Sequence, residues 1–149
     1  TVLCPRSAFL AVDGYDEVML GWGSEDTDFY RRLELAGYAR RVFDASLLEA
    51  IAHADALRTL HYEEPDPMRS VRLNAYYMHA KLDLMKLSGS TLSLAARQAL
   101  RARIEAQVRA VESGQTPALL DVPVGRQSYS DEFELRASLR YSLVPRASR

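Results

Sequence analysis

Apolar residues recur at spacings of three and four between Met68 and Met85, and this pattern constrains the fold more than any other part of the 149-residue chain. Such spacing places the side chains on one face of an α-helix. Asp66 stands at the expected N-cap and Pro67 at the first helical position. The sequence therefore predicts a long helix with one continuous buried stripe, formed by Met68, Val71, Ala75, Met78, Leu82 and Met85.

Two further helices are predicted on either side of this one. The first has about 13 residues, with Ser24 as a side-chain N-cap and Gly37 as its stop. The second runs from about Ser93 to Ser113 and ends at Gly114. Its apolar face holds Leu100, Ile104, Val108 and Val111, and its arginines are Arg97, Arg101, Arg103 and Arg109. We interpret these arginines as a solvated face, with a membrane-surface or partner role left open.

Short extended segments complete the predicted fold. The apolar run at residues 8–12 and the segment 41–43 are predicted as strands, as are residues 118–124 and 133–143. Residues 46–57 fit either a helix or a strand, and 57–62 are expected to be extended. We therefore expect a mixed, helix-rich α/β fold, with three main helices packed on a small, incomplete sheet.

Composition excludes several classes of protein. The formal net charge of -1 gives no general basic field for nucleic acid, so no nucleic-acid partner is expected. A single cysteine, Cys4, excludes an internal disulfide and a cysteine-rich metal site. We see no signal peptide and no apolar run of about 18 residues, the length that a membrane span requires. We expect a cytoplasmic location, either free or at the membrane periphery.

The segment Gly21-Trp22-Gly23-Ser24-Glu25-Asp26 carries the chemistry. An indole in a glycine-flanked loop offers a flat apolar face to the C–H face of a sugar ring, and glycine lets the backbone approach a ligand closely. Carboxylates in a first helical turn are favoured in their ionised form by the backbone N–H groups and the helix dipole. Such a carboxylate can orient sugar hydroxyls and accept a proton. The structural alternative is that the acids only stabilise the helix end and Trp22 belongs to the core.

The longer pattern Gly-Tyr-Asp-Glu, then Gly-Trp-Gly-x-Glu-Asp-x-Asp, then Arg-Leu-x-x-x-Gly resembles the β-1,4-galactosyltransferase family. It is also similar to bacterial chondroitin-type and polypeptide N-acetylgalactosaminyltransferases of the GT-A fold. The resemblance covers roughly residues 2–87. It implies that Trp22 stacks on the acceptor sugar, with Gly23 beside it. It implies that Glu25 and Asp26 bind acceptor hydroxyls and that Asp26 is the better candidate for the general base, while Asp28 and Arg32 support substrate binding.

The same resemblance implies a metal ligand, a histidine followed by a Glu-Pro-Asn-Pro-type loop and a helix. Glu64-Pro65-Asp66-Pro67 matches this loop. His61 directly precedes the loop and is the preferred ligand, whereas His53, followed by Ala54-Asp55, is the alternative. The expected ion is divalent, Mn²⁺ by resemblance.

We assign residues 1–87 to the C-terminal catalytic and acceptor region of such an enzyme. Residues 88–149 are then a helical extension and irregular tail of the same domain. The nucleotide-binding half of these families carries an Asp-x-Asp motif after a buried strand, and we expect a missing N-terminal half outside residues 1–149 to supply it. Asp26-Thr27-Asp28 has the right letters but follows Gly-Trp-Gly, so we reject it as that motif. We therefore expect the isolated chain to be inactive, and its uncovered apolar surface can pair two copies as a homodimer.

The expected function is that of an inverting hexosyltransferase. It would transfer a sugar of galactose or N-acetylgalactosamine type from a UDP-sugar to a saccharide or glycoconjugate acceptor. Three rivals remain: a non-catalytic carbohydrate-binding module, a helical interaction domain, and a glycosidase using Glu25 and Asp26. The last ranks lowest, because adjacent residues on one helical turn do not flank a glycosidic bond.

Overall fold

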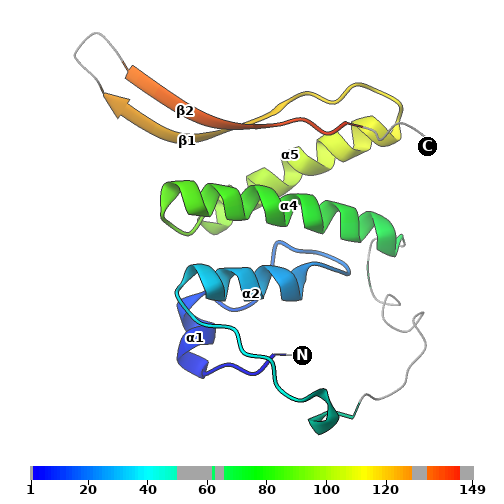
Figure 1. Ribbon diagram of the computed structural model, residues 1–149. Coiled ribbons are helices and arrows are strands. Elements are labelled where there is room, and N and C mark those ends of the chain that lie inside the picture. The colour runs from blue at the N-terminus through cyan, green and yellow to red at the C-terminus, as the bar shows by residue number, and fades with distance from the viewer. Residues whose placement is uncertain (1, 50–61, 63–65, 129–133, 145–149) are drawn as a thin grey trace. The chain divides into compact units, whose positions relative to one another are not determined.

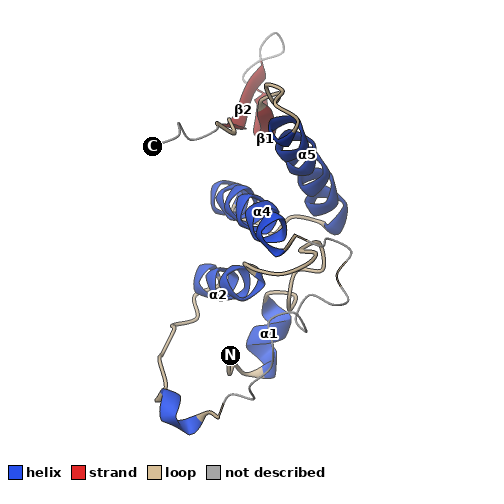
Figure 2. Cartoon of the chain, turned by 90° about the vertical axis from the view of Figure 1, so that its right-hand side faces the viewer, coloured by secondary structure: helices blue, strands red, loops and turns tan. Residues whose placement is uncertain are grey.

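The computed structural model describes residues 2–49, 62, 66–128 and 134–144 (Figure 1). The chain divides into two compact units, Thr1–Ala75 and Tyr76–Arg149. The elements in chain order are α1 (Arg6–Ala11), α2 (Glu25–Leu35), the 3₁₀ turn η1 (Ala45–Leu47), α4 (Pro67–Ser88), α5 (Leu94–Glu112), β1 (Leu120–Ser128) and β2 (Glu134–Tyr141). The mixed, helix-rich class and the three main helices, α2, α4 and α5, are confirmed (Figure 2). The boundary at residue 87 was drawn from the family resemblance, and it stays a prediction.

The first element is a helix, so the strand predicted at residues 8–12 is wrong. Ala8 and Val12 are four residues apart and are both buried, in one cluster with Phe29 and Leu33 of α2. Leu10, between them, is exposed. A five-residue apolar run fits a strand or a helix equally well, and here burial follows the helical spacing of four.

Helix α2 begins and ends by backbone geometry. Ser24 occupies the N-cap position with φ 72°, in the left-handed region, and its side chain makes no capping hydrogen bond. The predicted side-chain cap is therefore wrong. Gly37, at φ +87°, closes the helix as predicted: its N–H donates to the carbonyl of Glu34, and the N–H of Tyr38 donates to that of Leu33. This pair of bonds is the Schellman motif.

The chain after α2 has no regular secondary structure between residues 38 and 44, so the strand predicted at 41–43 is also wrong. A strand needs a neighbour for its backbone groups. In the described part of the chain, the sheet consists of β1 and β2 alone, and neither pairs with this segment. Residues 45–47 form a single 3₁₀ turn, and most of the predicted segments 46–57 and 57–62 lies outside the described residues.

Helix α4 starts as predicted. The carboxylate of Asp66 accepts a hydrogen bond from the N–H of Met68 at 2.9 Å, and Pro67 is the first helical residue. The single stripe is only partly right, because Met68 is exposed while Met78 and Leu82 are buried. A second row of buried residues follows the same helical spacing: Ser70, Leu73, Asn74, Tyr77, Ala80, Lys81 and Leu84. Helix α4 therefore buries side chains on two of its faces, whereas the sequence analysis predicted a single buried stripe.

In the second unit, α5 lies beside the β1–β2 hairpin (Figure 1). The predicted apolar face is confirmed for Leu100, Ile104 and Val108, which are buried. Arg103 donates to the carbonyl of Asp121 at 2.6 Å, and Arg109 pairs with Glu105 at 3.1 Å. Two of the predicted surface arginines therefore make specific contacts: Arg103 binds β1, and Arg109 forms an ion pair within α5.

The two strands pair antiparallel, with Leu120 opposite Tyr141. The register shifts between Pro123 and Gly125, which places the proline at a bulge, where its missing N–H costs little. Both predicted C-terminal strands are confirmed. None of the described helices has the length and apolar character needed to cross a membrane.

Candidate functional site

The glycine-flanked loop packs tightly against the first two turns of α4. A Cβ on Gly21 would lie 2.0 Å from Oγ of Ser70, and a Cβ on Gly23 would lie 2.7 Å from Cγ2 of Val71. Both glycines also have positive φ, +77° and +101°. The loop therefore requires glycine at both positions, for space and for backbone conformation.

Asn74 of α4 fixes this loop on both sides of Trp22. Its Nδ2 donates to the carbonyl of Leu20 at 3.0 Å and to that of Gly23 at 2.9 Å, which uses both of its protons. Trp22 itself is half-buried. Sequence reasoning did not assign Asn74 to the site. The sequence feature that could have indicated Asn74 is a polar residue next to the apolar stripe of a long helix.

Asp26 presents its carboxylate on the exposed side of the first turn of α2. The hydroxyl of Tyr15 donates to its Oδ1 at 2.8 Å. Glu25 is half-buried, and within the described residues its Oε2 is buried without a hydrogen-bond partner. A buried acceptor without a donor is destabilising, so a hydroxyl that reached this oxygen would add a hydrogen bond. The two acids predicted as catalytic thus differ in environment, and Asp26 is the accessible one.

Tyr15 is held in place by aromatic packing. Its ring stacks on Phe29, with centroids 4.8 Å apart and 22° between the planes, and meets Phe9 edge-on at 6.5 Å. Partial burial and the hydrogen bond to Asp26 raise the pKa of Tyr15 from 10.0 to about 12. The hydroxyl therefore stays protonated, and remains a donor to Asp26, throughout the neutral range.

Asp28 and Arg32 lie on the buried side of the same helix. Nε of Arg32 donates to Oδ2 of Asp28 at 2.8 Å, and Nη1 of Arg32 donates to the carbonyl of Val12. This arrangement links α2 to the end of α1. The supporting role of Asp28 and Arg32 in substrate binding stays a prediction. In the structure, the two side chains bind each other and the backbone of the first unit.

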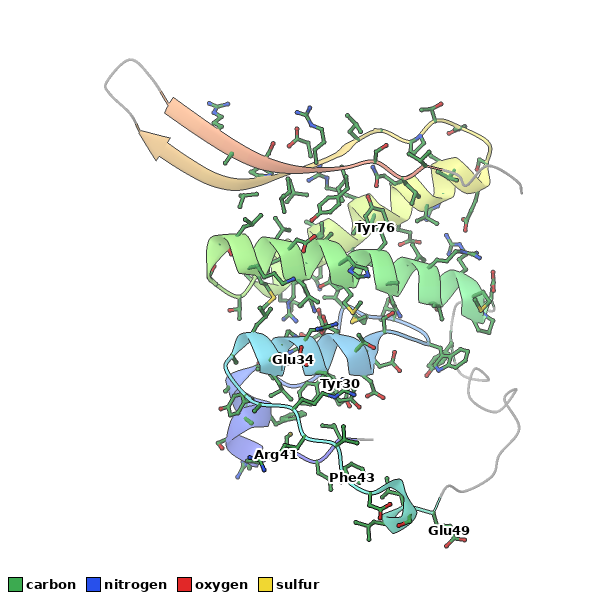
Figure 3. The ribbon with its side chains drawn as sticks, in the orientation of Figure 1. Tyr30, Glu34, Arg41, Phe43, Glu49 and Tyr76 are labelled. Carbon is green, nitrogen blue, oxygen red and sulfur yellow. The ribbon has the colours of Figure 1, made fainter. Side chains whose placement is uncertain are left out.

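A pocket of about 440 Å³ lies along another part of α2. Its wall includes Tyr30 and Glu34 from α2 and Arg41 and Phe43 from the following chain, all labelled in Figure 3. The lining does not include Trp22, Glu25 or Asp26. The predicted site at the start of α2 is therefore separate from this pocket.

The metal prediction falls largely outside the described residues. His53, His61 and residues 63–65 of the predicted loop are not described. Among the residues that the structure does describe, no three His, Cys, Asp or Glu side chains gather closely enough to hold a metal ion. His61 therefore stays a prediction.

Comparison with known protein families gives a match over the first part of the chain. A family model described as the N-terminal domain of galactosyltransferase matches residues 1–57. This range contains Tyr15, Trp22, Glu25 and Asp26, and it supports a galactosyltransferase-like glycosyltransferase. No curated protein matches, and no solved structure matches.

Proposed function

We propose that this chain supplies the acceptor-binding part of an inverting, UDP-sugar-dependent glycosyltransferase, with Asp26 as the general base. One observation carries the proposal: Asp26 stands exposed at the start of α2, four residues after Trp22, with one carboxylate oxygen already bound by Tyr15. A base needs a positioned carboxylate that a substrate hydroxyl can reach. The family match over residues 1–57 supports the same class of enzyme.

The acceptor saccharide would be held by the loop before α2. Trp22, between two glycines and two carbonyls fixed by Asn74, offers an apolar face for a sugar ring. Glu25 adds an acceptor oxygen that has no hydrogen-bond partner among the described residues. Holding the acceptor hydroxyl next to Asp26 lowers the barrier by positioning, an effect worth several kcal/mol.

The reaction is a single displacement. The acceptor hydroxyl gives its proton to the Asp26 carboxylate as its oxygen attacks the anomeric carbon. The bond from that carbon to the diphosphate breaks on the opposite face, UDP leaves with the electron pair, and the anomeric configuration inverts. The donor sugar in this proposal is of galactose or N-acetylgalactosamine type.

The remaining parts of the proposal are the GT-A fold and the metal. Residues 1–87 would be the C-terminal, acceptor-binding half of that fold, although the matching family model is described as an N-terminal domain. A divalent ion, Mn²⁺ in this proposal, supplies charge stabilisation at the leaving diphosphate when bound, with His61 as its ligand. Replacing His61 by Ala should raise the metal concentration that transfer requires, and the same effect from His53 alone would overturn the choice of ligand.

The decisive experiment is Asp26→Asn in the complete protein, with transfer to a saccharide acceptor and binding of UDP measured separately. Transfer should fall by about a hundredfold to ten-thousandfold while UDP binding persists, because only the proton acceptor is lost. Glu34→Gln, an exposed acid on the same helix, is the matched control and should keep its activity. Near-normal transfer by Asp26→Asn would refute the base, and saccharide binding with no transfer by the unmodified protein would favour a carbohydrate-binding module.

A further inference from the structure

The hydroxyl of Tyr15 reaches Asp26 across eleven residues of sequence, from the loop after α1 to the first turn of α2. The O–O distance of 2.8 Å is that of a normal hydrogen bond to a carboxylate. Bonds to an ionised acceptor are about twice as strong as neutral ones. This contact is therefore strong enough to choose one orientation for an exposed side chain that would otherwise rotate freely.

The donor is itself immobilised. The ring of Tyr15 is stacked on Phe29, which is fully buried, and touches Phe9. The sequence around it is kept in place by Asp16, whose carboxylate accepts the N–H of Val18 at 3.1 Å. Aromatic pairs of this kind stabilise the fold beyond the apolar area that they bury. The hydroxyl is thus a fixed point from which Asp26 can be oriented.

The bond also leaves the reactive side of the carboxylate open. Tyr15 binds Oδ1, and in the described part of the chain no other group is bonded to Asp26. An acceptor hydroxyl can therefore approach Oδ2. Among the described residues, the titratable groups that act on the pKa of Tyr15 through their charge are Asp26, Tyr30 and Glu25.

We infer that Tyr15 is the positioning residue for the proposed base: its hydroxyl, braced on Phe29, aims the Asp26 carboxylate so that Oδ2 faces the acceptor hydroxyl. This inference rests on the proposed function, and it assigns a residue for which neither the family match nor the sequence analysis gives a role. Tyr15 does not take the proton. It acts on the reaction only through Asp26.

The test is Tyr15→Phe in the complete protein, which keeps the ring on Phe29 and removes only the hydroxyl. The kcat should fall about tenfold with the donor KM unchanged, since the loss of a hydrogen bond to a charged group is worth that factor or more. Tyr38→Phe is the matched control, because Tyr38 has a similar exposure, 39% against 44%, and lies at the far end of α2. A kcat of Tyr15→Phe equal to that of Tyr38→Phe would overturn the inference.

A merely structural role is separated by a mutant cycle. If Tyr15 works through Asp26, the loss from Tyr15→Phe should largely vanish in an Asp26→Glu background, whose displaced carboxylate no longer meets the hydroxyl. Equal losses in both backgrounds would overturn the inference. Loss of transfer in Asp26→Asn together with full activity in Tyr15→Phe would refute the role of Tyr15 and leave the proposed base standing. Transfer activity in Asp26→Asn would instead refute the assignment of Asp26 as the base.

A further measurement keeps the inference testable if Tyr15→Phe does not fold. The hydroxyl of Tyr15 can be titrated by carbon NMR of the labelled ring, in the natural chain and in Asp26→Asn. The midpoint should fall from about 12 towards 10.0 when the carboxylate is neutralised. An unchanged midpoint would mean that the two groups do not meet in solution, and the inference would be lost.

Discussion

Arg32 and Asp28 form a buried ion pair one turn apart on α2, with 2.8 Å between Nε and Oδ2. The exposed fractions of the two side chains are 7% and 0%. Arg31 and Glu34, three residues apart on the same helix, form a second ion pair at 3.1 Å. Their side chains have exposed fractions of 62% and 35%. One helix therefore carries a buried and an exposed version of the same interaction.

Arg32→Met should lower the free energy of unfolding by about 3–5 kcal/mol, because it leaves Asp28 charged and buried without its main partner. Arg31→Met should change it by less than about 0.5 kcal/mol, since exposed pairs contribute little. Urea denaturation of the two variants makes the comparison. Equal losses of unfolding free energy in the two variants would mean that the Arg32–Asp28 pair is not buried in solution.

Gly21→Ala should be more costly than Gly89→Ala, although both glycines have positive φ, +77° and +65°. The backbone strain is common to both and is about 1–2 kcal/mol. Only Gly21 also faces Ser70, whose Oγ would lie 2.0 Å from the new Cβ, whereas none of the described residues comes within 4 Å of a Cβ at Gly89. Adding Ser70→Ala should restore part of the difference in melting temperature. A double variant no more stable than Gly21→Ala would contradict this close packing.

The loop around Trp22 should loosen in Asn74→Ala. The carbonyls of Leu20 and Gly23 would lose their donors, at a cost of roughly 1–3 kcal/mol. Trp22 is the only tryptophan, so tryptophan fluorescence reports on this loop alone, and its emission should move to longer wavelength. Arg72→Ala, an exposed change on the same helix, should leave the emission unchanged. If Asn74→Ala also keeps the natural spectrum, the amide does not hold the loop.

Local signals explain what the sequence predicted well. The Asp66 cap, the stop at Gly37 and the apolar face of α5 each depend on residues within a few positions of one another. Contacts distant in sequence explain what it missed. Asn74 reaches carbonyls 54 and 51 residues away, and no periodicity indicates such a pair. The helical state of α1 is decided by burial of Ala8 and Val12 against α2, which the apolar run alone does not specify.

Stability should fall between about pH 10 and pH 12 through Tyr15. Its pKa is raised from 10.0 to about 12 in the folded chain, so the folded state favours the protonated hydroxyl. This contribution is fully present below pH 10.0, the value in the unfolded chain, and is lost as the pH rises towards about 12. Burial also raises the pKa of Tyr76 and Tyr141, so the natural chain must be compared with Tyr15→Phe. Urea denaturation should show a shallower decline in the variant, and parallel declines would argue against the hydrogen bond to Asp26.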